Sequence, residues 1–228
     1  MALRITDATT VINIAQSNIS TFSLGFWFRR PTTTITEAVS IAIGLGRELY
    51  ESTTTLYVSG RSPPSPVVQP ATGEWRYLTI TKNGGNWAVY AFLDQGAQSA
   101  SAIWDDYGPV SAANIGFGDV SGPYATPLLN MEIAYARAWS SVLTLTQLNT
   151  EKNSTAPVIT SGLITNLPFI DSLTATSGTS ATNSGSGYDF TANLPLVLSG
   201  GGAVIDPGVI LAQLAGVFGP DRGFGFGY

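Results

Sequence analysis

The sequence feature that most constrains the fold is a strict alternation of bulky apolar residues. From residue 22 to residue 29, large side chains at the even positions alternate with Ser23, Gly25, Trp27 and Arg29. A period of two is that of a β-strand, in which successive side chains point to opposite faces of a sheet. This run therefore predicts a strand that buries one face in a core, and the buried residues are expected to be Phe22, Leu24, Phe26 and Phe28.

Other segments repeat this pattern and indicate an all-β chain. Residues 75–81 and 86–93 alternate on either side of Lys82-Asn83-Gly84-Gly85, whose Asn-Gly step favours positive φ, so they predict a hairpin. Further strands are expected at residues 38–45, 52–59 and 188–198, and loops at the proline-rich residues 62–70 and at residues 172–187.

Residues 131–139 predict a strand with large side chains on one face and alanines on the other. The large residues are Met131, Ile133, Tyr135, Arg137 and Trp139. Immediately after it, Thr144 and Gln147 have the spacing of a helical capping box, which predicts one short helix over residues 144–152.

Composition narrows the class of protein. Charged residues make up 11% of the 228 residues, less than half of the usual share of about 25%, so the surface is expected to be mostly Ser, Thr, Asn and Gly. A net charge of −5 without a basic cluster argues against nucleic-acid binding. No segment is apolar over a membrane-spanning length, and Met1–Ser17 lacks the apolar stretch of a signal peptide, so a soluble cytosolic start and no membrane partner are expected.

Four segments together resemble the concanavalin A-like lectin/glucanase superfamily, in its laminin-G-like or pentraxin-like branch, over residues 1–200. They are residues 22–28, residues 75–94, residues 133–148 and residues 168–192. The resemblance implies a two-sheet antiparallel jelly-roll β-sandwich with one short helix. Residues 201–228 are then an apolar, glycine- and aromatic-rich tail that follows the domain.

Catalysis and metal binding receive little support from the residue types present. The chain has no histidine and no cysteine, which excludes imidazole and thiolate sites, and the one adjacent acid pair, Asp105-Asp106, would point to opposite faces of a strand. The expectation is therefore no enzyme and no required cofactor. The resemblance implies calcium as the cofactor to consider, but the available acids show no ligand spacing: Asp94, Asp105, Asp106, Asp119, Asp171 and Asp189.

Two groups of aromatic residues are candidates for binding. Trp104, Tyr107 and Tyr124 lie in turn-rich segments and could form a platform for a glycan, the alternative being that they pack in the core or in loops. In the tail, glycines separate aromatic residues that cannot bury themselves locally. A partner subunit could accept these residues, or the tail could pack on its own domain; the docking residues are predicted to be Val217, Phe218, Phe224, Phe226 and Tyr228.

These features favour a non-catalytic structural protein of a virion-like assembly. The specific prediction is a phage capsid decoration or cement protein, or a tail-associated protein, assembled in the host cytoplasm and docked on capsid or tail subunits or on copies of itself. The alternative is a carbohydrate-binding lectin-type module, including an extracellular one, and a glycosidase is a third reading. Few charges to desolvate and an aromatic tail motivate the first choice.

Overall fold

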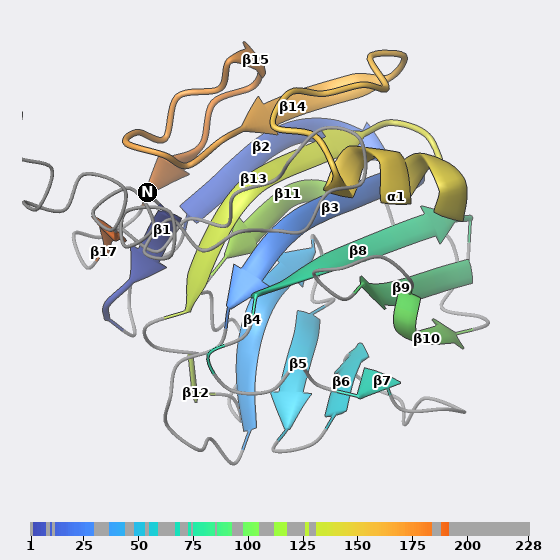
Figure 1. Ribbon diagram of the computed structural model, residues 1–228, viewed down its shortest axis with the longest axis horizontal. Coiled ribbons are helices and arrows are strands. Elements are labelled where there is room, and N and C mark those ends of the chain that lie inside the picture. Colours follow the sequence, from blue (N-terminus) through green and yellow to red (C-terminus); the bar gives the residue numbers. More distant parts are fainter. Residues whose placement is uncertain are drawn as a thin grey trace, which may run out of the picture.

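Two β-sheets pack face to face in the computed structural model of the chain (Figure 1). The structure describes residues 2–7, 10, 12–29, 37–43, 48–52, 55–58, 67–68, 73, 75–84, 86–92, 98–104, 112–117, 126–127, 131–183 and 188–191. Among them the pairings are antiparallel apart from one short parallel contact between β12 and β4. The all-β sandwich predicted from the sequence is confirmed.

The first sheet, sheet A, contains the strands with the strongest alternation. Its order is β10 (Gln98–Trp104), β9 (Asn86–Phe92), β8 (Trp75–Asn83), β3 (Thr21–Arg29), β13 (Glu132–Trp139), β1 (Ala2–Ile5) and β17 (Tyr188–Thr191), with β14 (Leu163–Leu167) on β13 and β15 (Ser177–Gly178) on β14. Sheet B has the order β16 (Thr182–Asn183), β2 (Ile12–Ile19), β11 (Ala112–Phe117), β4 (Glu37–Ile43), β5 (Glu48–Ser52), β6 (Thr55–Val58) and β7 (Val67–Val68), with β12 (Thr126–Pro127) on β4.

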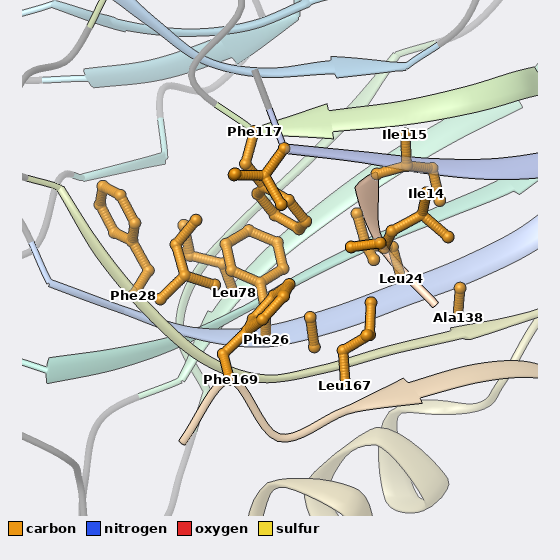
Figure 2. Close-up of a cluster of buried hydrophobic side chains, with 14 of the residues drawn as sticks. Ile14, Leu24, Phe26, Phe28, Leu78, Ile115, Phe117, Ala138, Leu167 and Phe169 are labelled. Carbon is orange, nitrogen blue, oxygen red and sulfur yellow. The ribbon is translucent and has the colours of Figure 1, made fainter. Parts of the chain in front are cut away.

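The core lies between the sheets and is rich in phenylalanine (Figure 2). The four alternating residues of β3 are buried in it, as the period of two predicts. Phe26 of sheet A meets Phe117 of sheet B edge to face at 5.4 Å, and Phe117 meets Phe169 at 6.2 Å. Because aromatic rings prefer this geometry, these contacts fix how the two sheets pack.

Strand β13 corrects the sequence-based assignment of its faces. Ile133 lies in the core as expected, but Tyr135 has φ +49° and the register with β3 shifts between Ala134 and Arg137. This β-bulge reverses the alternation, so Ala136 enters the core and Arg137 turns to the outer face of sheet A. The prediction that Tyr135, Arg137 and Trp139 share a face with Met131 and Ile133 was therefore wrong.

The bulge coincides with a fork in sheet A. On the same edge of β13, β1 pairs with Glu132 and Ile133, whereas β14 pairs with residues from Ala136 onward. Between these two partners, the Tyr135 N–H donates to the carbonyl of Pro168 at 3.0 Å. One strand thereby supports two branches of the sheet, which Figure 1 shows diverging as β1 with β17 and β14 with β15.

The predicted hairpin is β8 and β9, and its turn differs by one residue. Asn83 still belongs to β8, where it pairs with Asn86, and the turn begins at Gly84. Gly84 has φ +60° and Asn83 does not have a positive φ. The glycine, rather than the asparagine, takes the first left-handed position.

The predicted helix is α1 (Leu145–Lys152), which lies on the outer face of sheet A (Figure 1). Its capping box is formed: Gln147 N donates to Thr144 Oγ1 at 3.3 Å, and Thr144 N donates to Gln147 Oε1 at 2.8 Å. Leu148 packs with Trp27 and Trp139 beneath the helix. None of the helices in the described part is long and apolar enough to cross a membrane.

The remaining segments agree in part with the sequence-based assignments. The run at 52–59 belongs to two strands, β5 and β6. In the described part of the loop at 172–187, up to residue 183, the strands are the two-residue β15 and β16. Strand 188–198 is described as β17 up to Thr191, and β7 lies inside the proline-rich stretch 62–70. The tail, residues 201–228, lies outside the described residues.

Candidate functional site

The outer face of sheet A carries a cluster of large aromatic side chains. Trp27 and Tyr77 pack edge to face at 5.6 Å, and Trp139 Nε1 donates to the carbonyl of Ile159 at 2.7 Å. Trp75 and Tyr135 complete the cluster, and all five rings are buried. Helix α1 and the segment that follows it contribute to this burial, so the face is a second core and not an open platform.

A buried ion pair fastens α1 to this face. Arg137 Nη1 donates to Glu151 Oε2 at 2.6 Å and to the Glu151 carbonyl at 3.0 Å. The rest of the guanidinium is also bonded, with Nε donating to Asn166 Oδ1 at 2.9 Å and Nη2 to the carbonyl of Ser154 at 2.7 Å. These bonds join β13, β14 and the end of α1.

The second oxygen of the Glu151 carboxylate binds the loop that follows α1. Its Oε1 accepts from the N–H of Val158 at 2.9 Å and from the N–H of Ile159. Both oxygens are therefore engaged, and the loop after α1 is held against the sheet. Such a carboxylate supports the structure and is not available as an acid or base.

Farther from α1, one register row of sheet A alternates in charge. The row crosses β8, β3, β13, β1 and β17, with one residue from each strand. In that order, its members are Trp75, Arg29, Glu132, Arg4 and Asp189. Arg29 lies over the Trp75 ring at 5.5 Å and is paired with Glu132. We call these five residues the charge row.

The charge row is most exposed to solvent at its β17 end. Arg4 donates to Asp189 through Nε at 2.9 Å and Nη2 at 2.5 Å, and the two side chains are 38% and 45% exposed. The hydrogen bond to Asp189 raises the pKa of Arg4. Glu132 is 5% exposed and also accepts from Thr191 Oγ1 at 3.0 Å.

The aromatic residues proposed for glycan binding are not assembled into a platform by the described residues. Trp104, expected in a turn-rich segment, is the last residue of β10 and pairs with Trp87. Tyr107 and Tyr124 lie outside the described residues. So do the five tail residues Val217, Phe218, Phe224, Phe226 and Tyr228.

The acids considered for calcium are likewise dispersed. Asp189 is bonded to Arg4, and Asp171 is exposed after the end of β14. The described part of the chain contains no group of three acids that could hold a metal ion. Asp94, Asp105, Asp106 and Asp119 lie outside it.

A pair of tyrosines on sheet B was missed from the sequence. Tyr50 of β5 is the direct register partner of Tyr57 of β6, and Leu49 is the partner of Val58. Each strand contains the dipeptide Leu-Tyr, in ELYES and in TLYV. The shared Leu-Tyr dipeptide was the only hint of this pair in the sequence. The register shows that Tyr50 and Tyr57 occupy opposite positions on the neighbouring strands β5 and β6.

No protein-family model matches the chain, and no curated protein matches it in sequence. Solved structures match it in fold. A Bacteroides ovatus protein named as a candidate carbohydrate-binding protein has a TM-score of 0.59 at 14% identity, over 83% of this chain and 59% of that one. The present chain thus spans about three fifths of that protein's length.

Two further structures have similar scores. The heptameric SAP-like pentraxin of Limulus polyphemus has a TM-score of 0.52 at 14% identity, over 79% of this chain and 93% of that one. Full-length tailspike protein 2 of an Escherichia coli O157:H7 bacteriophage has a TM-score of 0.53 at 12% identity, over 74% of this chain and 26% of that one. With the sheet order described above, these likenesses show that the chain has a jelly-roll β-sandwich fold.

Proposed function

We propose that this chain is a non-catalytic module that binds carbohydrate. The support comes from the fold likeness to a candidate carbohydrate-binding protein over 83% of the chain, together with a surface poor in charge. Sugars are recognised by hydroxyl, amide and aromatic groups, and such a surface supplies them without the penalty of desolvating many ions.

The observation that carries the non-catalytic part is the engagement of three carboxylates in ion pairs. Glu132 is paired with Arg29, Glu151 with Arg137, and Asp189 with Arg4. Glycoside hydrolysis needs a protonated acid and a second carboxylate free to act on the sugar or on water. Each of these three carboxylates is bonded to an arginine and is not free in this way.

Glycan-array screening of the full chain, followed by calorimetric titration of each hit, tests the proposal. We expect at least one glycan to bind with a Kd in the micromolar to millimolar range, and no new reducing ends to appear on incubation. Absence of binding at millimolar glycan contradicts carbohydrate recognition. Release of reducing sugar contradicts the non-catalytic part alone.

A second candidate function is a structural role in a virion, in a tail-associated or a capsid-decoration protein. It is favoured by the likeness of 74% of the chain to a part of a phage tailspike. The sequence adds the glycine- and aromatic-rich residues 201–228, which we propose as the segment that docks on a neighbouring subunit.

This second candidate has its own test. Sedimentation and limited proteolysis compare the full chain with a chain that stops at Gly202. Assembly of the full chain, with a truncated form that is a folded monomer, supports docking through the tail. Two equally stable monomers with a freely cleaved tail contradict it.

A further inference from the structure

The Tyr50–Tyr57 pair lies on the outer face of sheet B, and this follows from the registers. Phe117 is in the core; it is the partner of Ile41, which is the partner of Leu49. Direct antiparallel partners share a face, so Leu49 and its partner Val58 occupy positions on the core face. Because strand positions alternate, Tyr50 and Tyr57 occupy positions on the opposite, outer face.

The spacing between β5 and β6 makes the Tyr50–Tyr57 pair about as wide as one sugar ring. Neighbouring strands lie about 4.8 Å apart, so two directly opposed aromatic positions extend over about the width of one pyranose ring. Pyranoses such as galactose and glucose have a face of C–H groups that stacks on the electron-rich face of an aromatic ring.

The surrounding strands indicate the charge of the ligand. Strands β4 to β7 contain neither lysine nor arginine, and Glu37 of β4 is the register partner of Ser52 of β5. By the same alternation, Glu48 and Ser52 share the face of Tyr50, and Thr55 shares that of Tyr57. Hydroxyl and carboxylate groups accept or donate to neutral sugars, whereas the acids repel sialic or uronic acids.

We propose that Tyr50 and Tyr57 form the aromatic platform of a binding site for a neutral sugar. This inference rests on the carbohydrate-binding function proposed above and assigns it a place and a ligand class. The site is on the sheet opposite α1: Figure 1 shows β5 and β6 at the bottom of the view and α1 at the top right. It is therefore separate from the buried aromatic cluster and from the charge row.

The test measures binding by the full-length chain to galactose, cellotetraose and maltotetraose, with sialyllactose as the anionic probe. Tyr50→Ala and Tyr57→Ala should each weaken binding of the preferred neutral probe by about tenfold or more, the equivalent of one lost stacking contact. Tyr50→Phe and Tyr57→Phe keep the ring and should stay within about threefold of the parent chain. Trp104→Ala, Tyr107→Ala and Tyr124→Ala test the rival platform, and thermal unfolding confirms that each variant is folded.

The outcomes separate the site from the function. If both alanine variants bind the neutral probe as the parent does while Trp104→Ala, Tyr107→Ala or Tyr124→Ala abolishes binding, carbohydrate recognition stands and the Tyr50–Tyr57 site is wrong. A preference for sialyllactose overturns the neutral ligand class. If the parent chain binds no glycan on the array or among these probes, the function proposed above fails and the site fails with it.

Discussion

Arg137 Nη1 lies 2.6 Å from Glu151 Oε2, and the two side chains are 1% and 0% exposed. An ion pair removed from water in this way is stable only if its other hydrogen-bonding atoms also have partners. Here Glu151 binds two backbone N–H groups and Arg137 binds Asn166 and Ser154. The Arg137–Glu151 pair therefore holds α1 and the loop that follows it on sheet A.

Replacing Arg137 tests this role. Arg137→Met leaves the Glu151 carboxylate buried without its cation and should lower the free energy of unfolding by about 3–5 kcal/mol. Arg4→Met is the matched control, because it breaks an arginine–carboxylate pair that is exposed, and it should cost about 1 kcal/mol or less. Urea unfolding measures both; equal effects would show that burial does not determine the value of these pairs.

Gly25 should tolerate no side chain while Tyr77 is present. A Cβ at Gly25 would lie 2.3 Å from Tyr77 Oη and 2.9 Å from Cζ. Gly25→Ala should therefore destabilise the protein by about 1–3 kcal/mol, as overpacking does. In Gly25→Ala/Tyr77→Phe, the closest atom is gone and part of this loss should be recovered, which a double-mutant cycle measures as a coupling energy. Additive effects would contradict the contact.

Two glycines with positive φ should respond very differently to alanine. At Gly178, φ is +80° and a Cβ would lie 1.9 Å from the carbonyl oxygen of Ile164, so backbone atoms must move. At Gly84, φ is +60° and nothing lies within 4 Å of the added atom. Gly84→Ala should cost about 1–2 kcal/mol for the left-handed backbone alone. Gly178→Ala should cost more, and the order of the two thermal midpoints checks it.

Alkaline pH should destabilise the fold through buried tyrosines. Burial raises the pKa of Tyr77, Tyr90 and Tyr135 above the ordinary 10.0. Unfolded tyrosines lose their protons first, so the stability is fully present below about pH 10 and is lost as pH rises beyond it. Burial lowers the pKa of Lys82 from its ordinary 10.5. The contribution of Lys82 to the stability therefore increases as the pH rises toward that value, opposite to the contribution of the tyrosines.

Tyrosinate absorbance and urea midpoints between about pH 8 and pH 12 check this prediction. Tyr77→Phe, which removes the most buried of these phenols, should reduce the loss of stability with pH and the amplitude of the late tyrosinate signal. If the urea midpoint of the parent chain does not decrease as the pH rises above about 10, the phenols ionise freely in the folded state.

Local patterns in the sequence predicted the parts of the fold that depend on neighbouring residues. The four core residues of β3 followed from a period of two, and α1 followed from Thr144 and Gln147, because both signals lie within a few residues. The turn at Gly84 was displaced by one residue, since the extent of β8 depends on its pairing with β9.

The misassigned faces of β13 have a non-local cause. The bulge at Tyr135 lies where β1 and β14 share one edge of β13, and nothing within residues 131–139 reveals that two different strands pair there. The candidate site follows the same rule. Tyr50 and Tyr57 became a pair only through the β5–β6 register, and the assignment of Trp104 to a turn-rich segment missed its pairing with Trp87 of β9.

The pairing of β1 with β17 has a consequence for how the chain is made. Leu3 is the partner of Phe190, and the bonded residues Arg4 and Asp189 are 185 positions apart. During synthesis, β1 therefore leaves the ribosome long before β17, the partner on one of its two edges. Contacts so distant make folding slow. Until β17 emerges, one edge of β1 stays open to other chains, so newly made copies are most vulnerable to misassembly while they are still being translated.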